Sequence, residues 1–156
     1  MIAIRAVPVD APDAVALIRD YFTEIVDRYH GRPMPASSVD AALAEAPLSA
    51  VAVLLVAYRD GVPVGCAGLL TAGPSTAELT KVYVRPQARR SGIARQLLAA
   101  VEEAARERGV TRLRLDTRAD LEEARGLYAA AGYREVPAWE HRRYADHFFV
   151  KDLLLS

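Results

Sequence analysis

The sequence predicts an α+β (mixed α/β) fold in which about seven strands form one sheet and about four helices flank it. Two observations lead to this prediction. β-prone segments alternate with amphipathic segments of helical period, in the order β-α-α-β-β-β-α-β-α-β-β. The 156 residues also show no internal repeat, low-complexity tract or linker, so one domain spanning residues 1–156 is expected.

The first predicted elements are a short strand and a long helix. Residues 2–6 alternate between apolar and polar or small side chains, which predicts the strand. Apolar side chains then recur at helical spacing from Val15 to Tyr29. Asp10 and Pro12 are start signals for this helix, and Gly31 is a stop signal.

A second helix and a hairpin follow. The helix is expected from about residue 38 to residue 46, with Ser37 or Ser38 as its cap and Pro47 as its stop. Residues 51–58 and 64–71 are β-prone runs on either side of a short turn that contains a glycine. This arrangement predicts two antiparallel strands.

The second half of the chain alternates strands with helices. Asp120 and Glu123 resemble a capping box in front of the last helix, and Gly132 is its stop signal. Helices are predicted at residues 92–108 and 121–131, and strands at residues 77–84, 113–115, 133–136 and 147–154.

Composition disfavours several classes of protein. Lys plus Arg and Asp plus Glu both number 20, and this zero net charge argues against nucleic-acid binding. Cys66 is the only cysteine, so an internal disulfide or a cysteine-based metal site cannot form. The start lacks a signal-peptide pattern, and the longest apolar run, residues 51–58, is too short to cross a bilayer. A cytoplasmic protein without membrane contact is therefore expected.

The connection between the strand at residues 77–84 and the following helix is the most informative segment. The first N–H groups of a helix have no partner within it, and the helix dipole is positive at that end. Gly92 and Ala94 are small enough for the backbone to approach a phosphate. A diphosphate site is a natural interpretation, although the same small residues also suit a plain strand-to-helix turn with a solvated rim. Positive charge near this turn comes from Arg89, Arg90 and Arg95.

This segment resembles the coenzyme A-binding motif of the GNAT acetyltransferase superfamily. Arg89-x-x-Gly92-x-Ala94 matches the Arg/Gln-x-x-Gly-x-Gly/Ala pattern of that family, in its expected place after a strand. One helix later, Leu127-Tyr128-x-x-x-Gly132-Tyr133 is similar to the family's Leu-Tyr-x-x-x-Gly-Phe/Tyr segment. The resemblance spans about residues 51–154. It implies a GNAT-like domain whose mostly antiparallel sheet splays in the middle.

The resemblance also implies that acetyl-coenzyme A is the acyl donor and that Arg89 belongs to its site. The pantetheine arm would bind as an extra strand along the backbones of Val82, Tyr83 and Val84. The diphosphate would be held by the backbone amides of Arg90, Ser91, Gly92, Ile93, Ala94 and Arg95.

Two residues are expected to carry the proton transfers that acetyl transfer to an amine requires. Tyr128 matches the tyrosine that many members use as a general acid near the sulfur, and its alternative is a core position on the apolar face of its helix. Glu78 matches the base of members with a similar strand, acting directly or through water. Its alternatives are a surface glutamate or a partner of Lys81 or of an arginine. Many relatives carry Asn seven residues before the tyrosine, where this chain has Leu121.

The histidines give weaker indications. No pair of His30, His141 and His147 has metal-ligand spacing on a helix, and no metal is expected. The resemblance implies an acceptor pocket near His141, with His30 and Arg32 as further candidates, and a surface loop is the alternative for each. Cys66 is expected in the core rather than as a nucleophile.

The sequence thus predicts an N-acetyltransferase that moves the acetyl group directly to a primary amine of a small molecule, an amino acid or a peptide. The alternative is a non-catalytic acyl-coenzyme A-binding regulatory module, although intact Glu78 and Tyr128 disfavour it. A nucleotide-binding regulator is disfavoured because the loop lacks the Lys-Ser/Thr ending of a P-loop. Asp116 is left open, as a cleft residue or a turn cap. Dimers are common in the family, so a homodimer is compatible with the resemblance.

Overall fold

The computed structural model describes residues 1–46 and 48–153, and its elements follow the predicted order. The helices are α1 (Pro12–His30), α2 (Ala36–Glu45), α3 (Ile93–Glu107) and α4 (Glu122–Ala130). The strands are β1 (Ile2–Ala6), β2 (Val51–Arg59), β3 (Val62–Thr71), β4 (Thr76–Val84), β5 (Arg112–Thr117), β6 (Arg134–Val136) and β7 (His147–Asp152). Short 3₁₀ turns precede β2 and α3.

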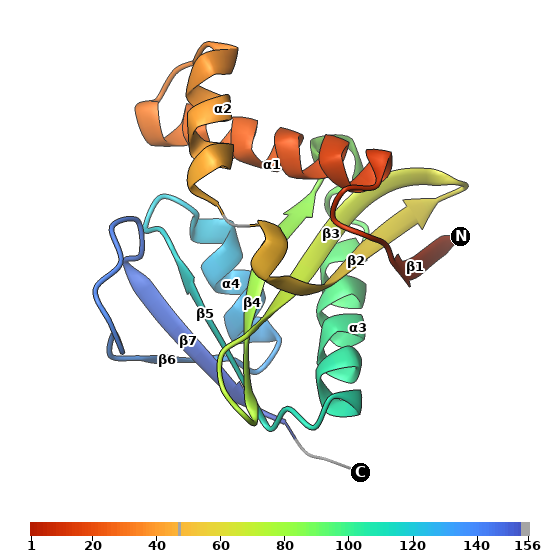
Figure 1. The fold of residues 1–156 in the computed structure, drawn as a ribbon, viewed down its shortest axis with the longest axis vertical. Helices are drawn as coiled ribbons and strands as arrows, with labels where there is room; N and C mark the ends of the chain where they lie inside the picture. The colour runs from red at the N-terminus through yellow and green to blue at the C-terminus, as the bar shows by residue number, and fades with distance from the viewer. Residues whose placement is uncertain (47, 154–156) are drawn as a thin grey trace.

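The strands form a single sheet with the order β1-β2-β3-β4-β5-β7-β6 (Figure 1). Every neighbouring pair is antiparallel except β4 and β5, which are parallel. Parallel neighbours need a long crossover, and α3 supplies it here. The predicted mostly antiparallel sheet of about seven strands with about four helices is therefore confirmed.

The sheet opens between β4 and β5, and the two strands diverge in Figure 1. They pair only from Thr76 to Glu78 on β4. The register between β4 and β3 then shifts, and Lys81 adopts a left-handed backbone with φ of 56°. A bulge of this kind inserts one extra residue and bends its strand. The end of β4 from Val82 onward therefore faces a gap rather than β5, which is the splay that the family resemblance implies.

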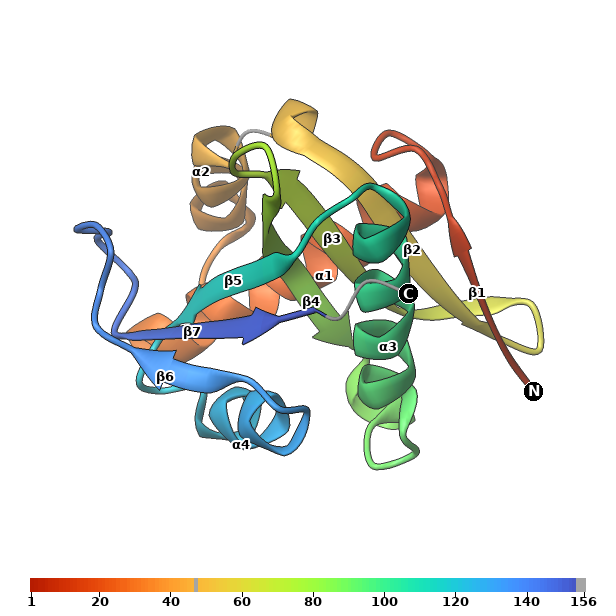
Figure 2. The same cartoon turned by 90° about the horizontal axis from the view of Figure 1, so that it is seen from below.

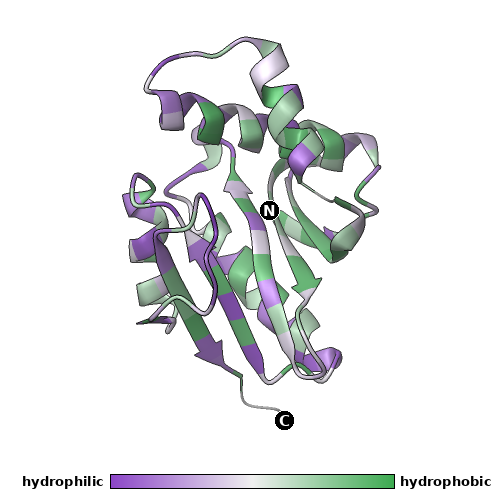
Figure 3. Cartoon of the chain, turned by 60° about the vertical axis from the view of Figure 1, so that its left-hand side comes forward, coloured by the Kyte–Doolittle hydropathy of each residue, from purple (hydrophilic) through white to green (hydrophobic). Residues whose placement is uncertain are grey.

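Helices cover both faces of the sheet (Figure 2). Side chains on β2 alternate between the faces, as strand geometry requires. Leu54 and Val56 join the buried cluster under α1 and α2, whereas Leu55 and Ala57 join the cluster under α3 and α4. Colouring by hydropathy shows apolar residues along the central strands (Figure 3). The sheet is thus buried on both faces.

The start of α3 lies close to the sheet because of a glycine on β3. A side chain at Gly65 would come within 2.8 Å of the Tyr83 carbonyl oxygen and 3.2 Å of Leu97 Cδ1. The face of α3 toward the sheet is buried, as the helical spacing predicts, and consists of Ile93, Leu97, Leu98, Val101, Glu102 and Ala105. Close packing at Gly65 fixes the start of α3 against the end of β4.

The predicted caps of α2 were wrong. The helix begins at Ala36 with Pro35 as its N-cap, so Ser37 and Ser38 lie inside the first turn. Pro35 has the extended backbone that an N-cap residue adopts, with φ of −66° and ψ of 157°, and it has no N–H that would need a partner. The predicted stop at Pro47 lies outside the described residues, as does the predicted end of the last strand at Leu154.

The predicted capping box before α4 was also wrong. The N-cap is Leu121, and no side chain caps the helix. The Asp120 carboxylate instead accepts two hydrogen bonds of 2.9 Å from Arg118, and Glu123 forms an ion pair with Arg28 of α1. Both carboxylates thus have an arginine partner, whose planar guanidinium can bind two carboxylate oxygens at once.

Candidate active site

The turn between β4 and α3 has the backbone shape of an anion site. Two residues of the turn have left-handed backbones, Arg90 with φ of 63° and Gly92 with φ of 82°. Gly92 is the N-cap of α3, and no side chain caps that helix start. Helix-start amides without a side-chain cap, next to left-handed residues, form a concave set of N–H donors. The position of Gly92 thus suits a bound phosphate.

Space in front of this turn is open. A Cβ atom built on Gly92 would meet no described atom within 4 Å, so glycine is needed for its φ angle rather than for room. Arg90 and Arg95 are exposed and form no ion pair with any described residue. Ser91 donates a 2.6 Å hydrogen bond to the Ala88 carbonyl, which holds the turn. The residues present therefore fit a diphosphate group.

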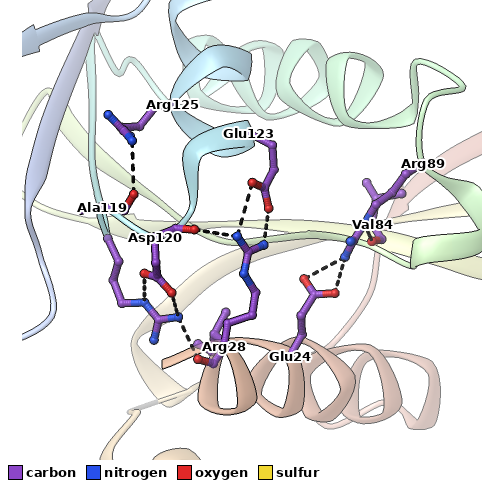
Figure 4. Close-up of polar contacts among 10 residues, drawn as sticks. Glu24, Arg28, Val84, Arg89, Ala119, Asp120, Glu123 and Arg125 are labelled. Carbon is purple, nitrogen blue, oxygen red and sulfur yellow. Dashed lines mark hydrogen bonds and ion pairs between the residues drawn. The ribbon is translucent and has the colours of Figure 1, made fainter. Parts of the chain in front are cut away.

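Arg89 has a different role from the other arginines of the turn. Its Nη2 donates to both carboxylate oxygens of Glu24 on α1, at 2.6 and 2.8 Å, and its Nε donates to the Val84 carbonyl at 2.8 Å (Figure 4). The guanidinium charge expected near the diphosphate is therefore neutralised by Glu24. These contacts tie α1 to the end of β4.

A second arginine links α1 to the other side of the gap. Arg28 forms an ion pair with Glu123 of α4 and donates a 2.6 Å hydrogen bond to the Asp120 carbonyl (Figure 4). Glu24 and Arg28 are one turn apart on α1, so neighbouring turns of the helix contact both sides of the splayed sheet. α1 thereby bridges the opening between β4 and β5.

Glu78 and Tyr128 line the same small cavity beside the open part of β4. Its volume is about 180 Å³. Both side chains are buried, with exposed fractions of 8% and 7%. This cavity is also lined by Lys81 at the bulge, by Val82, where the acetyl donor is expected to bind, and by Asp116 of β5. The fold thus brings the two expected proton-transfer residues together with Val82, where the donor is expected to bind.

Glu78 is held by an arginine that the sequence did not single out. Arg142 Nη1 donates to Glu78 Oε1 and, at 2.6 Å, to Asp116 Oδ2. Its other nitrogens donate to Glu140. Partial burial opposes the Arg142 charge, but hydrogen bonds to Glu78, Glu140 and Asp116 outweigh it and raise the pKa of the guanidinium. Three carboxylates from β4, β5 and the β6–β7 loop therefore meet on one guanidinium.

Tyr128 lies among aromatic side chains. Its ring centroid is 5.8 Å from that of Tyr133 and 6.1 Å from that of Phe149. Burial raises the pKa of the Tyr128 phenol above its usual value, with smaller contributions from Tyr21 and Asp116. The phenol is thus protonated at physiological pH and can donate a hydrogen bond. Its expected core position and its expected place at the reaction centre are both consistent with this location.

Lys81 contributes a partly buried ammonium to the small cavity. Its Nζ lies 5.5 Å from the centre of the Phe22 ring and 3.4 Å from Thr80 Oγ1, and it forms no ion pair with a described carboxylate. Burial lowers the pKa of this ammonium. The ion pair between Lys81 and Glu78 that the sequence allowed does not form.

A larger cavity of about 550 Å³ continues from the small one. Tyr21, Asp116, Thr117 and Leu121 line both cavities. The walls of the larger one come mainly from α1, α2 and the segments around β5 and residues 143–144. Asp116 thus proves to be a cleft residue at the junction, and Leu121 borders both spaces where many relatives carry Asn.

The other candidate site residues from the sequence lie in different parts of the structure. His30 lines the larger cavity, whereas the exposed residues Arg32 and His141 line neither. Cys66 is fully buried, and burial raises the pKa of its thiol to about 12, which confirms the core interpretation. Arg142 was missed because nothing in the run Glu140-His141-Arg142-Arg143 distinguishes one arginine from the next. Only the fold shows which of them reaches Glu78.

The sheet is splayed between β4 and β5, the uncapped start of α3 lies beside the opening, and two cavities adjoin it. This arrangement is that of an acyltransferase fold. The model of the Acetyltransferase (GNAT) family matches residues 14–133, and the chain belongs to that family. Members of the family are generally acyl-coenzyme A-dependent enzymes. No curated protein matches the sequence significantly.

Solved structures agree with this assignment. A Klebsiella pneumoniae protein assigned to the acyl-CoA N-acyltransferases is 26% identical, with a TM-score of 0.77 and 99% of each chain covered. A GNAT-family acetyltransferase from Staphylococcus aureus is 17% identical, with a TM-score of 0.76 over 99% of this chain and 100% of its own. The PaiA N-acetyltransferase of Thermoplasma acidophilum, solved in complex with coenzyme A, is 19% identical, with a TM-score of 0.75 over 97% of this chain and 99% of its own.

Two further findings concern the described residues only. No group of three or more His, Cys, Asp or Glu side chains among residues 1–46 and 48–153 is placed to hold a metal ion. None of the helices in that part of the chain combines the length and apolar character needed to cross a membrane.

Proposed function

We propose that this chain is an N-acetyltransferase that uses acetyl-coenzyme A as its donor and a primary amine as its acceptor. The observation that carries the proposal is the meeting of Glu78 and Tyr128 in one cavity beside the open half of β4. A coenzyme A complex of the Thermoplasma relative with the same fold supports the choice of donor. A cytoplasmic location, where coenzyme A thioesters are made, belongs to the same proposal.

The donor site is proposed along Val82, Tyr83 and Val84 and at the start of α3. No described strand pairs with that part of β4 on its β5 side, so the backbone is open to an extended ligand. The carbonyl of Val84 is already occupied by Arg89, so donors and acceptors must come mainly from the other backbone groups. The diphosphate group would lie on the amides of residues 90–95, where the helix dipole favours negative charge.

When bound, acetyl-coenzyme A supplies the acetyl group as a thioester, whose carbon–sulfur bond breaks as a carbon–nitrogen bond forms. Glu78 accepts a proton from the acceptor ammonium through a water molecule, because Arg142 already binds Oε1 of this carboxylate. Tyr128 donates a hydrogen bond and then its proton at the sulfur, and it recovers a proton from the nitrogen. Overall, one proton is released, and neither residue forms a covalent bond to the acetyl group.

Alignment is expected to contribute most of the rate. Glu78 and Tyr128 project from elements on either side of the gap, and buried packing fixes both. Holding an amine between them in the correct orientation removes much of the entropy barrier of a bimolecular reaction.

The test is release of the coenzyme A thiol from acetyl-coenzyme A with a broad panel of amines. Amine-dependent release in the wild type, lost in Tyr128→Phe, is the expected result. Binding of acetyl-coenzyme A without release for any amine would contradict the proposal and favour the non-catalytic module.

A further inference from the structure

The larger cavity has its charged end at the junction with the reaction centre. Asp116 lies at that junction, lining both cavities. Arg142 donates hydrogen bonds to Asp116, Glu78 and Glu140, so three carboxylates share one guanidinium. Arg114 lies 4.8 Å from the centre of the Trp139 ring. The hydrogen bond to Arg142 is the main cause that lowers the pKa of Glu140, and the charge of Arg114 adds a smaller effect.

The remaining cations around the two cavities do not restore neutrality at the junction. Arg118 is engaged by the Asp120 carboxylate and by the Ile25 carbonyl, at 2.8 to 2.9 Å. Lys81 lies beside Phe22 and is not near enough to any of the three carboxylates to form an ion pair. Among the described residues, three carboxylates therefore contact one guanidinium, that of Arg142, and Arg114 adds a second cation nearby without contacting them. An excess negative charge in a partly buried site attracts an ammonium and repels a carboxylate.

The walls beyond the junction are mainly apolar, and His30, Ser38 and Arg118 also line them. The α1 residues Phe22, Ile25 and Val26 form one wall, and alanines of α2 form another. A volume of about 550 Å³ lies within the range of about 300–1,000 Å³ that is typical of small-molecule sites. The cavity thus offers room for an apolar body larger than a simple alkyl chain.

The mouth of the cavity carries an exposed aromatic pair. Tyr29 and Tyr144 are 55% and 43% exposed, and their ring centroids lie 5.3 Å apart in an edge-to-face arrangement. Exposed apolar surface beside a cavity marks an interaction site, and tyrosine rings can pack against the ring of a ligand. The exposed charges at the lining, Glu45 and Arg143, are of opposite sign and give no net preference for an acidic ligand.

We propose that the acceptor is an aromatic primary amine that bears no carboxylate next to its amine, with the ammonium at Asp116 and the ring between Phe22 and the Tyr29–Tyr144 pair. This inference rests on the proposed function and specifies the acceptor of the same site. The negative charge at the junction favours the ammonium group of the acceptor. The apolar walls and the exposed tyrosine pair favour its aromatic ring. A carboxylate on the carbon that bears the amine would lie against Asp116 and Glu78.

The test compares tryptamine with tryptophan, which differs from it only by that carboxylate, and with spermidine, an amine without an apolar body. For the wild type, kcat/KM for tryptamine is expected to exceed the values for the other two by tenfold or more. Asp116→Asn is expected to lower kcat/KM for tryptamine about tenfold while acetyl-coenzyme A still binds. Asp60→Asn, the same change in the distant β2–β3 turn, is the matched control and should leave kcat/KM unchanged.

Calorimetric titration of tryptamine into protein saturated with coenzyme A adds a readout that does not depend on turnover. Binding weakened by Asp116→Asn is expected. Turnover of tryptophan or spermidine as efficient as that of tryptamine would overturn the inference and leave the proposed function standing. If tryptamine binds through Asp116 but no amine is acetylated, the proposed function fails and the acceptor site is supported. Absence of tryptamine binding would overturn the inference.

Discussion

The two sides of the opening in the sheet are built from different kinds of atoms. Beyond the side chains of Glu78 and Lys81, the side of β4 and α3 presents backbone groups, from the open end of β4 to the uncapped first turn of the helix. On the side of β5 and α4 it presents side chains, of which Asp116, Tyr128 and Arg142 are the main ones. α1 holds the two sides together through Glu24 and Arg28.

This difference determines which substitutions should matter where. A site made of backbone groups depends on φ and ψ angles, so it tolerates most changes of side chain and is sensitive to changes at glycine. A site made of side chains depends on charge and hydrogen-bonding capacity, so a single change of chemistry should alter it. Substitutions on the two sides of the opening should therefore differ in what they change.

Tyr128→Phe should lower kcat about 10²- to 10⁴-fold, the usual contribution of a positioned proton donor, with the affinity for acetyl-coenzyme A little changed. Tyr133→Phe is the matched control, because this buried phenol contacts Glu102 at 3.3 Å and lines neither cavity. Steady-state kinetics with the best amine of the panel would measure both. Similar kinetics for wild type and Tyr128→Phe would remove this residue from the proposed mechanism.

Arg142→Met should lower the free energy of unfolding by about 2 kcal/mol, because it leaves the buried Glu78 carboxylate without its partner. The neighbouring substitution Arg143→Met is the control. Arg143 is exposed and stacks 5.1 Å over the Tyr144 ring, so its effect should stay within about 0.5 kcal/mol. Urea unfolding of the two variants would contradict this account if their stabilities were equal.

Gly92→Ala should weaken coenzyme A binding about fivefold, because alanine disfavours the left-handed φ of 82° by about 1 kcal/mol. Gly109→Ala is the matched control, because it introduces a similar backbone strain. Gly109 has φ of 77° and also has nothing within 4 Å of its added Cβ, but it lies at the opposite end of α3. Both variants should lose similar stability by urea unfolding, and only Gly92→Ala should lose affinity by calorimetry. Equal affinities would argue against the helix-start site.

Lys81→Met should change the free energy of unfolding by less than about 1 kcal/mol, and the size of this change should depend on pH. Burial lowers the pKa of Lys81 in the folded state below its ordinary value of 10.5, so the unfolded chain binds more protons between the two values. The free energy of unfolding of the wild type should therefore rise relative to Lys81→Met as the pH increases toward 10.5. Urea titrations at a series of pH values would measure the difference, and parallel curves would contradict it.

Much of the fold could be predicted because its determinants are local. Apolar periodicity gave α1 and α3, and the two β-prone runs around a turn gave the β2–β3 hairpin. Helix starts were less predictable, although Ser37, Ser38, Asp120 and Glu123 all have capping chemistry. The outcome followed instead from a proline, from the local ion pair of Asp120 with Arg118 and from the tertiary ion pair of Glu123 with Arg28. Alternative capping residues differ by only about 1 kcal/mol in the stability that they give a helix, and one arginine contact can offset that difference.

The site divides in the same way. The β4–α3 turn is continuous in sequence, so its glycine and its helix start could be recognised there. The cluster at Arg142 joins β4, β5 and the β6–β7 loop, with Glu78 and Arg142 separated by 64 positions, and no local pattern indicates the contact. The neutralisation of Arg89 by Glu24 has the same origin, because that partner lies 65 positions away. Contacts of this kind follow only from the packed fold.

The most direct test of the central claim is an amide nitrogen–proton NMR titration of the protein with coenzyme A. The claim is that the donor binds to backbone groups at the open end of β4 and the start of α3. The account predicts that the largest shifts fall on the amides of residues 82–84 and 90–95, with little change in α2. Largest shifts in α2 and along the walls of the larger cavity, with residues 90–95 unaffected, would contradict it.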